Sequence, residues 1–73
     1  MAEVYCNYGV VNKETGQCFE EGDTIESLTF YDCSGNKTNL KDAYVYDISS
    51  DNITVISESG QMRIEIRDIV SWE

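Results

Sequence analysis

The sequence contains no histidine and no proline, and it has only 5 lysine and arginine residues. Without histidine, the Ser-His and Cys-His nucleophile pairs are excluded, together with the commonest general base. The three cysteines include no C-x-x-C pair, so the spacing of a structural zinc site is missing. No nucleophile–base signature remains, and we therefore expect a non-enzymatic protein with no cofactor and no bound metal.

The charge is strongly one-sided. Asp and Glu number 14, which gives a formal net charge of −9 at pH 7. Nucleic-acid binding draws on cations that neutralise phosphates, so direct contact with DNA or RNA is disfavoured, as is an anionic membrane. The field of the chain favours a basic protein partner instead. Two interpretations stay open: the acidity serves binding, or it only keeps a small domain soluble.

The length of 73 residues suits one domain, so residues 1–73 are treated as a single unit. The first three residues lack the basic charge of a signal peptide, and no stretch approaches the ~20 apolar residues of a membrane span. These features predict a cytoplasmic protein whose Cys6, Cys18 and Cys33 are reduced thiols. Each cysteine falls at or near a strand position, which predicts a buried or half-buried small hydrophobe.

Apolar residues recur at every second position along most of the chain, which predicts β-strands. Residues 3–19 are expected to form a hairpin around a polar turn. The further strands are predicted at 27–33, 43–48, 53–57, 62–67 and 69–72, with a polar bridge before residue 43 and a one-turn element from Asp68. No window shows an apolar stripe at helical spacing. Short strands separated by turn residues indicate a small all-β barrel or sandwich.

The expected inward faces follow from this alternation. Leu28 and Phe30 should point inward in their strand, and Ala43 and Val45 in the next. The opposite face of residues 43–48 would carry Tyr44 and Tyr46, with Ile48 as a further candidate for that face. In the clearest strand the inward set is Met62, Ile64 and Ile66, and the solvent-facing set is Arg63, Glu65 and Arg67.

From Leu28 to Trp72 the chain runs Leu-x-Phe, a glycine turn, a polar bridge, Ala-x-Val, a short turn, Ile-x-Val, a second glycine turn and Met-x-Ile-x-Ile-x-Asp-Ile-x-x-Trp. This order resembles a five-stranded SH3-like barrel of the Sm-like kind, and its layout is similar to that of the Rof family of Rho-inhibitor proteins. The resemblance implies a barrel over residues 27–73, extended by the 3–19 hairpin, and edge-to-edge pairing into a homo-oligomer, most simply a homodimer.

Two features depart from the Sm-like pattern. That pattern begins with a helix, whereas residues 3–19 are expected to form a hairpin. The Asp and Asn that Sm proteins use for RNA have no counterpart, because Asp51-Asn52 lie in a much tighter turn. The resemblance therefore implies the fold and the assembly, and it does not carry RNA binding over to this chain.

Three tyrosines at outward strand positions lie beside three aspartates, and together they form the candidate partner-binding set: Tyr31, Tyr44, Tyr46, Asp32, Asp42 and Asp47. Exposed tyrosines among carboxylates favour a protein-binding face, since tyrosine is enriched at interface hot spots. Alternatively, Tyr44 and Tyr46 form a second layer under the N-terminal hairpin. The acidic segment 20–23 lacks the alternate-position ligands of a calcium loop, so we predict a solvated acidic loop there.

Two functions remain in competition. The first is an acidic binding or inhibitor protein that occupies a basic surface of a nucleic-acid-binding protein, of the kind that phages and mobile elements encode. The alternative is an oligomeric Sm-like barrel that holds or sequesters a small nucleotide between subunits, with Arg63 or Arg67 as the cation that an anionic ligand requires.

Overall fold

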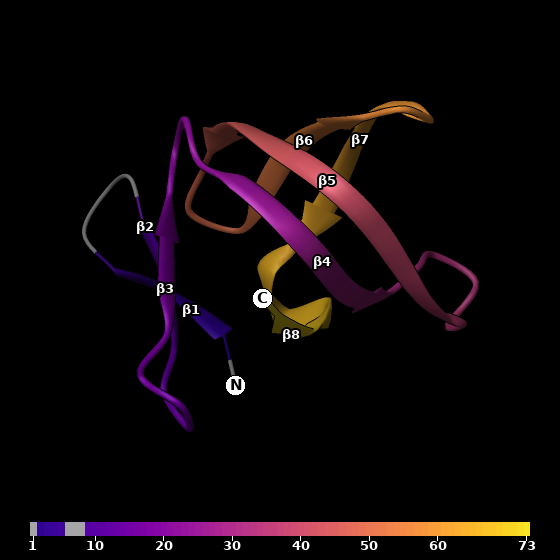
Figure 1. The fold of residues 1–73 in the computed structure, drawn as a ribbon. Helices are drawn as coiled ribbons and strands as arrows, with labels where there is room; N and C mark the ends of the chain where they lie inside the picture. Colours follow the sequence, from indigo (N-terminus) through magenta and orange to yellow (C-terminus); the bar gives the residue numbers. More distant parts are fainter. Residues whose placement is uncertain (1, 6–8) are drawn as a thin grey trace.

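The computed structural model describes residues 2–5 and 9–73, and their secondary structure is almost entirely β-strand (Figure 1). A small antiparallel sheet has the order β1-β2-β3, built from β1 (Ala2–Tyr5), β2 (Gly9–Asn12) and β3 (Cys18–Glu20). A larger antiparallel sheet contains β4 (Thr24–Tyr31), β5 (Lys37–Ile48), β6 (Asn52–Ser57), β7 (Gly60–Glu65) and β8 (Ile69–Trp72). The all-β prediction is confirmed.

The larger sheet has the strand order β7-β6-β5-β4-β8. Strands β4 to β7 follow one another as hairpins, and the one-turn 3-10 helix η1 (Ile66–Asp68) carries the chain to β8, which pairs with β4. Among the described residues no ladder joins β7 to β8. The five strands predicted as a closed barrel thus form an open sheet, because its two end strands lack a common set of hydrogen bonds.

One apolar core joins the two sheets. Leu28, Val45 and Val55 of the large sheet are fully buried, and Val10 of β2 belongs to the same cluster. Phe19 of β3 contacts the edge of the Trp72 ring with the ring centroids 4.9 Å apart, so the two sheets meet at β8. In Figure 1 the small sheet covers one end of the large sheet, and the β6–β7 hairpin extends away from it.

Strand β5 is longer than the alternation predicted. It begins at Lys37 and includes the polar segment 37–42 that was expected as a bridge, because this segment pairs with β4 from Tyr31↔Lys37 onward. Two irregularities bend it. Asp42 adopts a left-handed backbone conformation with φ 51°, and the register with β6 shifts between Val45 and Asp47. Such a bulge leaves one residue of β5, Tyr46, without a partner in β6.

Several predicted side-chain positions are confirmed and others are wrong. Ile64 and Ile66 are buried, although Ile66 lies in η1 instead of a strand. Met62 is 36% exposed, because β7 is an edge strand that pairs only with β6 among the described strands. Cys18 and Cys33 are exposed and not buried, since one begins a three-residue strand and the other lies in a turn. Cys6 lies outside the described residues.

Candidate functional site

The structure divides the candidate partner-binding residues between two regions. Tyr44, Tyr46 and Asp47 lie in the half of β5 that pairs with β6. Tyr31 and Asp32 lie at the opposite end of the β4–β5 hairpin, where Tyr31 pairs with Lys37. Tyr31 and Thr24, which pairs with Tyr44, are seven residues apart along β4, about 23 Å at the usual strand rise. The six residues therefore do not form one continuous face.

The first region is an exposed apolar cluster on the outer side of the large sheet. Tyr44 lies directly opposite Ile56 of β6, and directly opposed residues in an antiparallel pair share a face. Tyr44 is 42% exposed, Tyr46 61% and Ile56 39%. We call Tyr44, Tyr46 and Ile56 the β5–β6 surface. Their exposure rules out the alternative in which the two tyrosines lie beneath the N-terminal hairpin.

The bulge determines which side chains of β5 face solvent. Val45 pairs with Val55 and Asp47 with Thr54, so Tyr46 is the inserted residue. Tyr44, Tyr46 and Asp47 are consequently all exposed, and Ile48 turns inward and is buried. The prediction that Ile48 shares a face with the tyrosines is wrong for this reason: an inserted residue shifts the alternation by one position.

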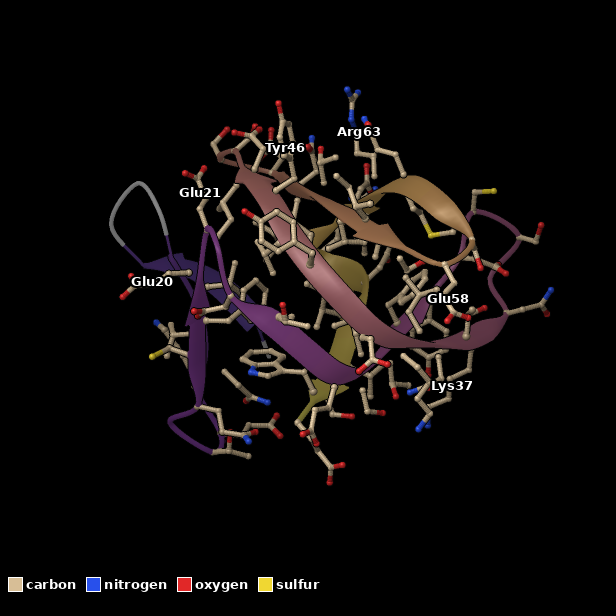
Figure 2. All side chains as sticks on the ribbon, turned by 45° about the horizontal axis from the view of Figure 1, so that its top comes forward. Glu20, Glu21, Lys37, Tyr46, Glu58 and Arg63 are labelled. Atoms are coloured by element: carbon tan, nitrogen blue, oxygen red, sulfur yellow. The ribbon has the colours of Figure 1, made fainter. Side chains whose placement is uncertain are left out.

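The acidic loop 20–23 is attached to this bulge by hydrogen bonds. The Ile48 N–H donates to Glu21 Oε2 at 2.9 Å, and the Gly22 N–H donates to the Val45 carbonyl at 2.8 Å. The Val45 N–H donates to the Asp23 carbonyl at 2.8 Å. Figure 2 shows Glu21 and Tyr46 projecting from the same side of the molecule. The loop thus holds carboxylates beside the β5–β6 surface, a role that its sequence did not indicate.

Carboxylates border the β5–β6 surface along its length. Asp47 follows Tyr46 directly, Asp42 precedes Tyr44 by two residues, and Glu21 binds the backbone of Ile48. The cations placed nearest by the sequence and the strand register are Lys41, beside Asp42, and Arg63, which faces Asp47 across Thr54. Apolar side chains within a predominantly acidic border are suited to a partner with basic side chains around an apolar recess.

Asp32 has a structural role as well. The Asp32 carboxylate closes the turn after β4: Oδ1 accepts the N–H groups of Ser34 and Asn36, both at 2.9 Å, and Oδ2 accepts the Thr38 hydroxyl at 3.2 Å. These bonds, with the Asn36 N–H as the largest contribution, lower the pKa of Asp32.

The second region is a groove of about 660 Å³ between the end of β4 and the edge strand β7. Tyr31 lines it together with Arg63 and Arg67, the two cations of the alternative ligand site. Its apolar side chains include Met62 and Ile64. The Arg67 Nε donates to Glu65 Oε2 at 2.9 Å on the surface of the molecule. The structure therefore brings one candidate tyrosine together with both candidate arginines.

Ile56 and Met62 were not among the predicted site residues. Ile56 had a usable signal, because it occupies an outward position in a strand whose inward residues are Ile53 and Val55. No signal in the sequence indicated the exposure of Met62, because the edge position of β7 depends on the strand order of the whole sheet. Across residues 2–5 and 9–73 no three His, Cys, Asp or Glu side chains gather as ligands for a metal ion.

In the described part of the chain, no helix has the length and apolar character needed to cross a membrane. Comparisons with protein-family models, with curated proteins and with solved structures found no match to this chain.

Proposed function

We propose that this chain is a non-enzymatic binding protein whose β5–β6 surface docks on a basic surface of a protein target. The observation that carries the proposal is the exposed cluster of Tyr44, Tyr46 and Ile56 within an acidic border. Strand pairing fixes the main chain at Tyr44 and Ile56, so little backbone entropy is lost when a partner covers them. Apolar side chains on an ordered sheet and carboxylates around them supply the two parts of an interface, an anchor and a charged rim.

The two parts would act at different stages of binding. A net charge of −9 attracts a basic target over a distance and raises the association rate. A tyrosine buried in the complex slows dissociation, and truncation of such a hot spot costs about 2 kcal/mol or more. Where the target's basic surface normally contacts phosphates, an acidic cover competes with nucleic acid for it. We therefore favour an inhibitor of a nucleic-acid-binding protein, acting in the cytoplasm and encoded by a phage or mobile element.

The fold type belongs to this proposal. The strand order β7-β6-β5-β4-β8, with a 3-10 turn before the last strand, supports an SH3-like arrangement of the Sm-like kind. The similarity in layout to Rho inhibitors of the Rof family favours the inhibitor interpretation, since those proteins act on a nucleic-acid-binding factor. Homo-oligomer formation stays a prediction of the same resemblance.

An affinity capture with salt-stepped elution tests the proposal. The wild-type chain should retain a basic protein that elutes as salt rises, and Tyr46→Ala should release it at lower salt. Tyr31→Ala is the matched control, because Tyr31 is equally a surface tyrosine but lies in the groove. Retention that is unaffected by Tyr46→Ala, or a captured protein that is acidic, would contradict the proposal.

The groove supports the second candidate, an oligomeric barrel that binds a small nucleotide. Tyr31 offers a ring for stacking, and Arg63 and Arg67 offer cations for phosphate. Arg67 is already engaged by Glu65, which makes Arg63 the stronger candidate. Native mass spectrometry of the purified protein distinguishes the two functions: a co-purified anionic ligand that is lost in Arg63→Ala supports this candidate, and its absence from the wild-type protein argues against it.

A further inference from the structure

The edge strand β7 presents backbone hydrogen-bonding groups that β6 does not use. The Ile66 N–H, immediately after β7, donates to the Asp51 carbonyl at 2.9 Å, so the backbone groups of residue 66 face β6. Backbone groups alternate in direction along a strand, and residues 60, 62 and 64 therefore face β6 as well. The N–H and C=O groups of Gln61, Arg63 and Glu65 point the opposite way, toward the open edge of the sheet.

The groove runs along this same edge. Four consecutive residues of β7, from 62 to 65, line it. Both the inward and the outward side chains of the strand are thus included, so the groove lies against the edge of β7 and not against one face. On its far side are the end of β4 and the turn that follows, with Tyr31 46% exposed. Among the described residues these backbone groups have no partner strand, and an apolar recess lies beside them. This is the arrangement that accepts an added strand.

The charged side chains around the groove indicate which charge an added strand should carry. The Asp, Glu and Arg side chains among its described lining residues are three carboxylates and two guanidinium groups, namely Asp32, Glu65, Asp68, Arg63 and Arg67. Hydrogen bonds from the turn, chiefly that of the Asn36 N–H, lower the pKa of Asp32. A second copy of this chain would bring a further charge of −9 to an edge that is itself acidic, and the two copies would repel each other.

We propose that β7 accepts an extended segment of a basic partner as an additional strand of the large sheet. The segment pairs with the N–H and C=O groups of Gln61, Arg63 and Glu65. Its alternate side chains are apolar and enter the groove beside Met62 and Tyr31, and the intervening side chains include lysine or arginine. This site is separate from the β5–β6 surface and does not depend on the function proposed for it.

The probe is a synthetic eight-residue peptide of alternating lysine and valine, titrated into the isotopically labelled full chain. We expect amide hydrogen exchange at Gln61, Arg63 and Glu65 to slow by about tenfold or more when the peptide is in excess, because these groups gain hydrogen-bond partners. The same peptide with N-methyl groups on alternate backbone nitrogens should bind at least about tenfold more weakly. An alternating glutamate–valine peptide should not bind.

Two variants of the chain test this site, and only Tyr46→Ala is confined to the β5–β6 surface. Arg63→Pro removes an N–H that points to the open edge, a change that edge strands tolerate, and it should weaken peptide binding by about tenfold. Tyr46→Ala should leave peptide binding unchanged, even if the function proposed for Tyr46 is wrong. The N-methylated peptide keeps the test decisive if Arg63→Pro does not fold.

Three results would overturn the proposal. One is unchanged amide exchange at β7 in excess peptide, and another is equal binding of the N-methylated peptide. The third is protection of the same amides without peptide at rising protein concentration, which would assign the edge to a second copy of this chain.

Discussion

The β5–β6 surface and the β7 groove offer a partner different chemical groups. On the β5–β6 surface, Tyr44 and Ile56 lie in strands that have neighbours on both sides, so only side chains are available for contact. At the groove, β7 pairs with one strand, β6, within the described part of the chain, and its outer backbone groups face the open edge. The first region suits a folded target with a complementary surface, whereas the second suits an extended segment.

The two regions also depend on different local structural features. The β5–β6 surface depends on the Tyr46 bulge and on Glu21, which supplies an acceptor for the N–H of Ile48. One wall of the groove depends on the turn that Asp32 closes. Carboxylates serve as backbone acceptors in both places, so the acidity of the chain has a structural use in addition to its effect on partners. Substitutions can therefore disturb one region and leave the other intact.

The largest effect is expected from a change in the core that both regions share. Ile64 is buried in the large sheet and also lines the groove. Ile64→Asp places a charge in this core and should unfold a domain of this size. Glu65→Ala, at the exposed neighbouring position, should change the free energy of unfolding by less than about 0.5 kcal/mol. Thermal melts compare the two, and equal melting temperatures would show that the assigned register of β7 is wrong.

A smaller effect is expected at the kink in β5. Asp42 has a φ of 51°, in the left-handed region. Asp42→Val introduces a β-branched side chain at positive φ and should lower the free energy of unfolding by about 1–2 kcal/mol. Asp42→Gly should be neutral or slightly stabilising, since glycine adopts positive φ without strain. Urea unfolding measures both, and a Val variant as stable as the Gly variant would contradict the assigned kink.

Glu21→Ala and Glu20→Ala are matched substitutions that test how the acidic loop 20–23 holds the Tyr46 bulge. Glu21→Ala removes the acceptor of the Ile48 N–H and should cost about 1 kcal/mol. Glu20→Ala removes an exposed carboxylate with the same charge and should cost less than about 0.5 kcal/mol. Amide exchange at Ile48 should quicken in the first variant only. If the two variants unfold alike and exchange alike, the loop does not hold the bulge.

The smallest effect concerns pH and the wall of the groove. The pKa of Asp32 is lowered in the folded chain, chiefly by the Asn36 N–H. A lowered carboxyl pKa contributes stability that is present above the unfolded value of 3.8 and is lost as pH falls through the folded pKa. Asp32→Asn should therefore reduce the dependence of stability on pH below about 4. Denaturant midpoints across that range test this, and an unchanged slope would contradict it.

The sequence predicted the elements in which alternation is regular. Leu28 and Phe30, and Ala43 and Val45, are all buried, as a period of two requires. It missed the first half of β5, because residues 37–42 are mostly polar and become a strand by pairing with β4. The bulge at Tyr46 and the exposure of Met62 were also missed, since both depend on which strands lie beside these residues.

For the candidate partner-binding residues, the sequence predicted outward strand positions for three tyrosines, and Tyr31, Tyr44 and Tyr46 are exposed. Their role in binding stays a prediction. Their division between two regions follows from the length of the β4–β5 hairpin, which alternation does not encode. The sequence made Arg63 a candidate to bind an anionic ligand. The strand register places it across Thr54 from Asp47, so Arg63 borders both the groove and the β5–β6 surface.

The rates of binding to the captured basic partner, measured over a range of salt, test the central claim most directly. Neutralising Asp42 and Asp47 to Asn should slow association and flatten its dependence on salt. Tyr46→Ala should speed dissociation by about 30-fold, equivalent to about 2 kcal/mol, with little change in association. Binding that survives these changes in Asp and Tyr but is lost in Arg63→Ala would contradict the account and favour an anionic ligand in the groove.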